Sequence, residues 1–249
     1  RSDTIIVASV SCIYGLGRPE NFQTLGFEAE VGHKVKRNDF LRRLVNIQYE
    51  RNDVELAPGR FRVKGGTIDL IPGYYDNIIR IEMFGDEVNR IKEIDKTTGA
   101  VVEEMRHYFI YPARHFVIAE KDKTRAIESI KEELELRLPE LGLVEAHRLR
   151  QRTLYDIEMM EQMGFCNGIE NYSRHLSNRK PGEPPPTLID YFPKDFLLIL
   201  DESHQTVPQI GAMYKGDRSR KDMLVEYGFR LPCARDNRPL TFEEWQGRI

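Results

Sequence analysis

Residues 196–204 have the sequence FLLILDESH, in which an apolar run leads directly into two adjacent carboxylates, Asp201 and Glu202. A continuous apolar run lacks the alternation of a half-exposed strand, so it predicts a strand buried on both faces of a parallel sheet. Two carboxylates at the carboxyl end of such a strand lie where open α/β sheets bind ligands. In P-loop NTPases an acid at this place holds Mg²⁺, and a second acid can activate the attacking water. The alternative is a strand that ends in a solvated acidic turn.

Residues 4–10 (TIIVASV) show the same pattern and predict a second buried strand, which breaks into a turn-rich segment ending at Pro19. The predicted fold class is therefore α/β. Because a strand is an unusual place for an α/β domain to begin, we expect this chain to be an internal segment of a longer protein.

The composition limits the possible partners. The chain has 249 residues, 40% of them hydrophobic, and a net charge of only −3, so any contact with DNA must be a local patch. No apolar run has the length of a membrane span, so no membrane partner is expected. The three cysteines are far apart in the sequence and odd in number. This argues against a disulfide framework or a zinc site and predicts a cytoplasmic protein.

Residues 20–112 have a different sequence pattern, which predicts a separate α+β domain inserted into the α/β part. A helix is expected over 38–50, and short alternating segments separated by glycine-containing turns follow it. Period-two alternation with turn signals at such spacing predicts a small antiparallel sheet. Its strands are expected at 60–64, 67–71, 78–84, 88–94 and 107–111.

Two helical patterns follow, at 120–138 and 144–163, and predict a helical hairpin. Pro139 stops the first helix. The apolar stripes of the two helices are Ile127, Ile130, Leu134 and Leu138, then Leu149, Leu154, Ile157, Met160 and Met163. We interpret these side chains as core.

A nucleotide-hydrolysing site also needs a loop that cradles phosphate, and this sequence lacks one. The nearest match to that motif begins at Gly211 and reaches Gly216, but Asp217 stands where the motif requires lysine. An acid there would repel phosphate. This chain alone is therefore not expected to hydrolyse ATP.

Polar side chains that could hold a nucleic acid gather in residues 168–175 (GIENYSRH). An aromatic ring, an amide, a hydroxyl and two potential cations could grip a backbone and stack a base, or could be a solvated helix start. Ser9 and Ser11, at the end of the first predicted strand, could donate to phosphate or merely cap.

Charged residues alternate along two strands of the predicted sheet. Arg62 and Lys64 share one strand, and Arg80 and Glu82 share another. A period of two places each pair on one face of the sheet. That face is either ordinary solvated surface or a polar patch on which a protein docks.

Taken together, these segments resemble the UvrB family of the nucleotide excision repair complex. The resemblance covers essentially the whole chain. Its most specific strings are ASVSCIYGLG (8–17), LRRLVNIQYERND (41–53), FRVKG (61–65), MGFCNGIENYSRHL (163–176), DESHQTVP (201–208) and YGFRLPCARDNRP (227–239).

The resemblance implies a P-loop NTPase fragment of the superfamily 2 helicase-like type. Residues 1–19 would end its first helicase-like segment, and 20–112 would be the domain that binds UvrA. Residues 113–249 would form a helical damage-handling region and then return to the helicase-like domain. The family's phosphate-binding loop and second motor domain are not in this sequence.

The resemblance also assigns roles to individual residues. Asp201 and Glu202 would be catalytic, with Asp201 holding the metal. Contacts with DNA would come from Ser9, Ser11, Tyr14, Arg152, Asn171, Tyr172, Arg174 and His175. Contacts with UvrA would come from Arg62, Lys64, Arg80 and Glu82.

The implied function is recognition and verification of DNA damage by an ATP-dependent excinuclease subunit. ATP and Mg²⁺ are expected in the full-length parent and not on this chain alone. The implied partners are UvrA, damaged DNA and, for the parent, UvrC. One alternative is a non-catalytic UvrA-binding module such as that of the transcription-repair coupling factor, and another is an unrelated helicase.

Overall fold

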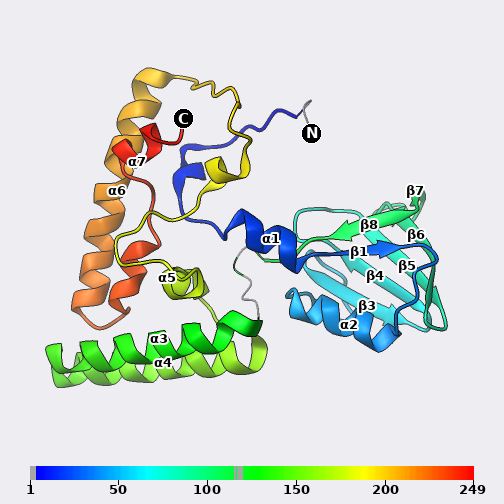
Figure 1. Cartoon of the computed structure of the whole chain (residues 1–249), viewed down its shortest axis with the longest axis horizontal. Coiled ribbons are helices and arrows are strands. Elements are labelled where there is room, and N and C mark those ends of the chain that lie inside the picture. Colours follow the sequence, from blue (N-terminus) through cyan, green and yellow to red (C-terminus); the bar gives the residue numbers. More distant parts are fainter. Residues whose placement is uncertain (1–3, 115, 117–119) are drawn as a thin grey trace. The chain divides into compact units, whose positions relative to one another are not determined.

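The computed structural model describes residues 4–114, 116 and 120–249, and the chain divides into two compact units. Glu20–Val117 form the sheet unit, and Arg1–Pro19 with Ile118–Ile249 form the helical unit (Figure 1). The elements of the sheet unit are β1 (Phe27–Glu30), α2 (Arg37–Asn46), β2 (Glu50–Arg51), β3 (Arg60–Lys64), β4 (Thr67–Ile71), β5 (Ile78–Phe84), β6 (Glu87–Ile94), β7 (Val101–Met105) and β8 (His107–Ile110). Helix α1 (Pro19–Leu25) begins at the boundary between the units.

The main sheet has the strand order β2-β3-β4-β5-β6-β7, and β1 pairs with β8 in a second, two-stranded sheet. Neighbours from β3 to β7 are antiparallel, whereas β2 runs parallel to β3. The strands predicted at 60–64, 67–71 and 78–84 are confirmed, and so is the antiparallel sheet. Strand β7 was not predicted, because it is an edge strand without buried alternate residues that would mark it in the sequence.

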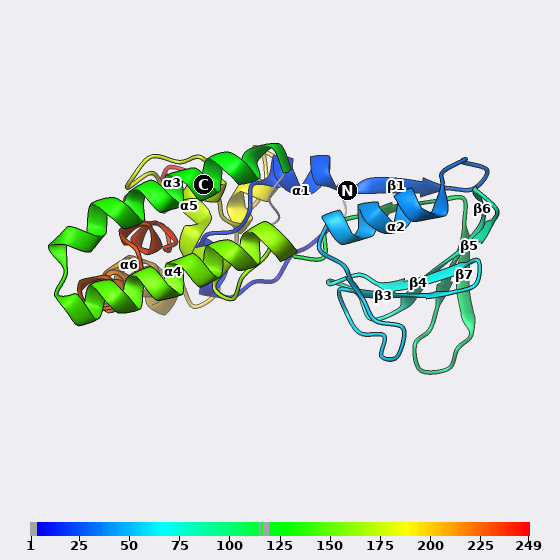
Figure 2. The same ribbon diagram turned by 90° about the horizontal axis from the view of Figure 1, so that it is seen from below.

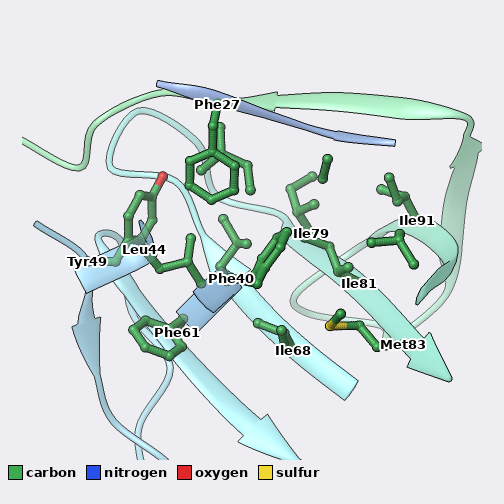
Figure 3. Packing of buried hydrophobic residues seen from close by; sticks show 14 of the residues in the cluster. Phe27, Phe40, Leu44, Tyr49, Phe61, Ile68, Ile79, Ile81, Met83 and Ile91 are labelled. Carbon is green, nitrogen blue, oxygen red and sulfur yellow. The ribbon is translucent and has the colours of Figure 1, made fainter. Parts of the chain in front are cut away.

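One face of the main sheet carries the core of this unit. Phe61, Ile68 and Ile81 project from β3, β4 and β5, and each is almost fully buried. Phe40 of α2 and Phe27 of β1 lie over them, so α2 and the small sheet cover this face (Figure 3). Phe27 and Phe40 meet edge to face, with ring centroids 5.2 Å apart, which is a favoured arrangement of two aromatic rings.

The turn between β3 and β4 requires its two glycines for different reasons. Gly65 has φ +59°, a conformation that side chains with a Cβ disfavour. Gly66 has no room for a side chain, because a Cβ there would lie 2.5 Å from the carbonyl oxygen of Met83. The turn therefore fixes which residues of β3 and β4 face one another.

The elements of the helical unit are η1 (Val10–Ile13), α3 (Glu120–Arg137), η2 (Leu138–Glu140), α4 (Leu143–Met163), η3 (Ile169–Tyr172), α5 (Ser173–Leu176), η4 (Leu188–Tyr191), α6 (Ser203–Glu226), η5 (Pro232–Asp236) and α7 (Phe242–Gln246).

Helices α3 and α4 lie side by side and form the predicted hairpin (Figure 2). Ile127 and Ile130 of α3 and Leu149 of α4 are buried, as the stripes predicted. Leu154 and Met163 are exposed, so their assignment to the core was wrong. They fall outside the buried arc because only one side of α4 packs against other elements of this unit.

The predicted strands at 4–10 and 196–200 are wrong for this chain: neither segment belongs to a sheet among the described residues. Val7 is 94% exposed, Leu197 84% and Ile199 79%. A strand buried on both faces needs hydrogen-bonded neighbours and covering helices. The described residues supply no neighbouring strand beside these two segments, and only Val10, Phe196 and Leu200 pack partly against the core around Ile210 and Trp245. The P-loop NTPase part of the predicted fold class is therefore not confirmed, because its two predicted strands form no sheet among the described residues.

Within the part of the chain that the structure describes, no helix combines the length and apolar character that crossing a membrane requires.

Replacement of Phe40 by alanine should destabilise the sheet unit by about 3–5 kcal/mol, because a large core side chain would leave a cavity. Amide hydrogen exchange of β4 and β5 would measure this loss within the sheet unit. Val54→Ala, at an almost fully exposed position, is the control and should change the free energy of unfolding by less than about 0.5 kcal/mol. Equal effects of the two substitutions would contradict the assignment of this core.

Candidate functional site: a row of charges on the sheet

The face of the main sheet opposite the core carries a row of charges, one on each of five neighbouring strands. The backbone register places Arg62 opposite Asp69, Asp69 opposite Arg80, Arg80 opposite Lys92, and Lys92 opposite Glu104. Directly paired residues share a face, so their side chains are neighbours. We call these five residues the charged row.

Asp69 joins the two arginines of the row. The Nε and Nη2 groups of Arg62 donate to its Oδ2 atom at 3.0 and 2.9 Å. Arg80 donates from Nε to Oδ1 at 2.7 Å and from Nη2 to Oδ2 at 3.0 Å. The Asp69 side chain is 4% exposed, whereas those of Arg62 and Arg80 are 24% and 33% exposed. A buried carboxylate thus holds two cations that reach the surface.

These contacts shift the pKa values of Asp69 and Arg80. Burial raises the pKa of Asp69, but the hydrogen bonds from Arg80 and Arg62 together outweigh it and place this pKa below the ordinary 3.8. The hydrogen bond to Asp69 likewise raises the pKa of Arg80. Asp69 and Arg80 are therefore charged at neutral pH.

The four predicted UvrA-contacting residues lie on this face. Glu82 accepts a hydrogen bond from the Lys92 ammonium at 3.1 Å. Lys64 is exposed at the end of β3, and Thr67 lies between it and Glu82 in the neighbouring row. Sequence reasoning missed Asp69, although an aspartate between apolar residues in a strand is unusual enough to mark it.

The predicted catalytic acids lie in the helical unit, immediately before α6. Asp201 and Glu202 are both exposed, and Asp201 accepts a hydrogen bond from the backbone N–H of Glu202 at 3.0 Å. Glu202 caps α6 with φ +47°, and its carboxylate lies 3.3 Å from His204. Carboxylate oxygens suit Mg²⁺, so Asp201 could hold the ion, but among the described residues it belongs to no group of three or more potential metal ligands.

Three of the predicted DNA-contacting residues are buried in the helical unit. Arg174 donates to Asp236 at 2.9 Å and to Glu133 at 2.8 Å. His175 lies 2.6 Å from Glu133 through its Nε2 atom. These pairs join α3, α5 and η5, which are far apart in the sequence.

The third buried residue, Tyr172, donates from its hydroxyl to Asp156 at 2.8 Å. Arg152 reaches the same carboxylate from Nε at 3.0 Å. Asn171 donates to the carbonyl oxygen of Gly168 at 2.8 Å. Each of these three side chains therefore has an internal partner.

The remaining predicted DNA-contacting residues, Ser9, Ser11 and Tyr14, line one open cavity of about 220 Å³. The hydroxyls of Ser9 and Ser11 are 2.5 Å apart, and Tyr14 donates to Asp217 at 3.3 Å. The two serines are exposed, so they are accessible to a ligand in a way that Arg174 and His175 are not.

Glu133, His175 and Cys233 bring potential metal ligands within 4.8 Å of one another. The group is better explained as a hydrogen-bonded network. A metal ion would have to displace the Arg174 guanidinium, whose Nη2 atom lies 2.8 Å from Glu133. Burial, the largest cause, also raises the pKa of the Cys233 thiol well above its ordinary value of 9.0.

Comparisons with known proteins match both units. Residues 27–116 match the family described as the UvrB interaction domain, and residues 121–178 match the UvrB third helical domain. The chain is 67% identical to UvrABC system protein B of Methanosarcina acetivorans over 246 residues, which cover 99% of this chain and 37% of that protein. The protein of the same name from Carboxydothermus hydrogenoformans is 59% identical over 254 residues, covering 100% of this chain and 38% of that protein. The chain thus spans less than two fifths of the length of these relatives.

Replacement of Arg174 by glutamine should destabilise the helical unit by about 3–5 kcal/mol, because it leaves Glu133 and Asp236 without their buried cation. Urea unfolding followed by the fluorescence of Trp245, which is buried in the same unit, would measure this loss. Arg150→Gln, whose ion pair with Glu135 is exposed on both sides, is the control and should cost at most about 1 kcal/mol.

Unchanged stability of Arg174→Gln would contradict this structural role. If the salt slope of DNA binding by the full-length protein then also fell by about one unit, Arg174 would be a phosphate contact.

Proposed function

The chain belongs to the UvrB family, and on that premise we propose that it is a segment of a UvrABC system protein B that acts in nucleotide excision repair. In this proposal the sheet unit docks UvrA, and the helical unit belongs to the part that verifies damage on DNA. The observation that carries the proposal is the charged row, because it lies entirely within the residues that match the interaction domain.

The signs of the charges favour a protein partner on this face. Arg62, Arg80 and Lys92 are positive, whereas Asp69 and Glu104 are negative. Nucleic-acid backbones carry one sign of charge and attract surfaces of the opposite sign. A protein surface can match mixed signs, and such a match sets the register of the two partners as well as attracting them.

For DNA, we propose two layers of residues in the helical unit. Ser9, Ser11 and Tyr14 line an open cavity and are the candidates for direct contact. Tyr172, Arg174 and His175 are buried and would hold the surface in shape from beneath. Arg152 and Asn171, both half-buried, would complete the surface.

For ATP, we propose that Asp201 holds Mg²⁺ and that Glu202 activates the attacking water in the full-length protein. Both carboxylates are exposed and adjacent, as such roles require. The phosphate-binding loop would come from residues outside this sequence, as would the surface that recruits UvrC. The cytoplasmic location suggested by the cysteines stays a prediction.

The alternative, a non-catalytic UvrA-binding module such as that of the transcription-repair coupling factor, accounts for the sheet unit alone. The match of residues 121–178 to the third helical domain of UvrB favours the first proposal. So does the continuation of the likeness to UvrABC system protein B across 99% of the chain.

Charge reversal at Arg62 or Arg80 should weaken the binding of UvrA by the full-length protein by about 2 kcal/mol or more, or roughly 30-fold. Arginines at the centre of an interface are common hot spots, and reversal would set like charges against each other. A binding titration measures the effect, and thermal melting verifies folding. Arg42→Glu is a matched control, because this exposed arginine belongs to α2 on the opposite side of the sheet. Wild-type affinity of both folded variants would remove this face from the interface.

Glu202→Gln in the full-length protein should preserve nucleotide binding while reducing ATP turnover by about 10²–10⁴-fold, the usual contribution of a general base. The present chain alone should show no turnover, since it lacks a phosphate cradle. Phosphate release and nucleotide binding would be measured in parallel. Turnover by this chain that persists after Asp201→Ala would contradict the proposed roles.

A further inference from the structure

Asp69 stands out on the polar face because it is charged, buried and surrounded by two cations from different strands. It lies in the middle of β4, between Arg62 of β3 and Arg80 of β5. Its two carboxylate oxygens accept four hydrogen bonds from these arginines, at 2.7 to 3.0 Å. A buried carboxylate is costly without such partners, so its presence requires both arginines to point at it.

The way in which the arginines bind Asp69 leaves one edge of each free. Both use the Nε and Nη2 atoms, which form the side edge of the guanidinium. Among the described residues, no partner takes the Nη1 group of either arginine. The planar guanidinium can bind a second carboxylate through its Nη1–Nη2 edge with two parallel hydrogen bonds. Both side chains are partly exposed, so they reach the surface on which a partner would dock.

We infer that Asp69 is a positioning residue that aims Arg62 and Arg80 at carboxylates on an acidic surface of the protein partner. This inference rests on the proposed docking function of the sheet unit. It adds Asp69, which does not itself contact the partner but fixes the orientation in which the two arginines contact it. It also assigns the chemistry of the complementary site, which is a pair of acidic side chains spaced to meet two arginines from β3 and β5.

Two physical effects give Asp69 this role. A free arginine samples many rotamers, and ordering it on binding reduces affinity, whereas an arginine that is already held loses less entropy. Burial also protects the Asp69 contacts from water and salt, so the arrangement persists in the unbound protein. The arginines of the row are therefore preorganised for the partner.

The decisive experiment exploits opposite signs of two effects. Asp69→Asn removes a negative charge, so long-range attraction to an acidic partner should increase and binding should tighten. Loss of the aimed geometry should weaken binding instead, and we expect weakening of about tenfold, or about 1.4 kcal/mol. The titration uses the full-length protein and UvrA at two salt concentrations.

Asp95→Asn is the matched control for charge. Asp95 lies in the same unit and accepts hydrogen bonds from the backbone of its own turn, at Thr97 and Thr98. Asparagine can keep such a turn, so only the charge changes. We expect unchanged or slightly tighter binding. An Asp69→Asn variant that behaves like this control would overturn the inference.

A second variant covers the case in which Asp69→Asn does not fold. Arg80→Lys keeps the positive charge but loses the forked geometry, and should also weaken binding about tenfold. Where both variants fold, the double variant should lose little more than either alone, because both changes remove the same arrangement. Additive losses, or full affinity of Arg80→Lys, would overturn the inference.

The outcomes separate this inference from the proposed function. Full affinity after charge reversal at Arg62 and Arg80 would remove the docking site itself. Loss of affinity on charge reversal, with full affinity for Asp69→Asn, would leave the docking site and remove only the positioning role. If the variants with charge reversal at Arg62 and Arg80 lost binding of duplex DNA but kept full affinity for UvrA, the row would be assigned to nucleic acid and the inference would be overturned.

Discussion

The strict alternation of side chains along β3, β4 and β5 is the constraint on which the sheet unit depends. Phe61, Ile68 and Ile81 face the core because every second residue of these strands must do so. The residues between them are thereby committed to the other face, where the register lines them up as the charged row. A slip of one residue would bury the charges and expose the core, so one requirement specifies both faces.

The placement of the cations distinguishes the two units. In the sheet unit, Asp69 is buried and its arginines reach the surface, so the cations remain available to a partner. In the helical unit, Arg174 is itself buried between Glu133 and Asp236. The same type of ion pair therefore presents charge outward in one unit and fastens three segments together in the other.

Sequence patterns determined much of the fold and only part of the site. The hairpin of α3 and α4 and strands β3 to β5 follow from local periodicity, which a chain carries wherever it folds. The same rule predicted which charged residues share a strand face, namely Arg62 with Lys64 and Arg80 with Glu82. The role predicted for them came from the resemblance to UvrB, since alternation alone is equally compatible with a solvated surface.

Only the tertiary structure decided which side chains meet. The clamp between Arg62, Asp69 and Arg80 depends on strand register, and the partners of Arg174 come from α3 and η5, which no local pattern brings together. The apolar segments at 4–10 and 196–200 also show that local composition alone does not decide whether a segment becomes a strand. Their composition is that of buried strands, yet most of their residues remain exposed here. A strand is completed by hydrogen bonds to its neighbours, whereas a helix satisfies its own backbone.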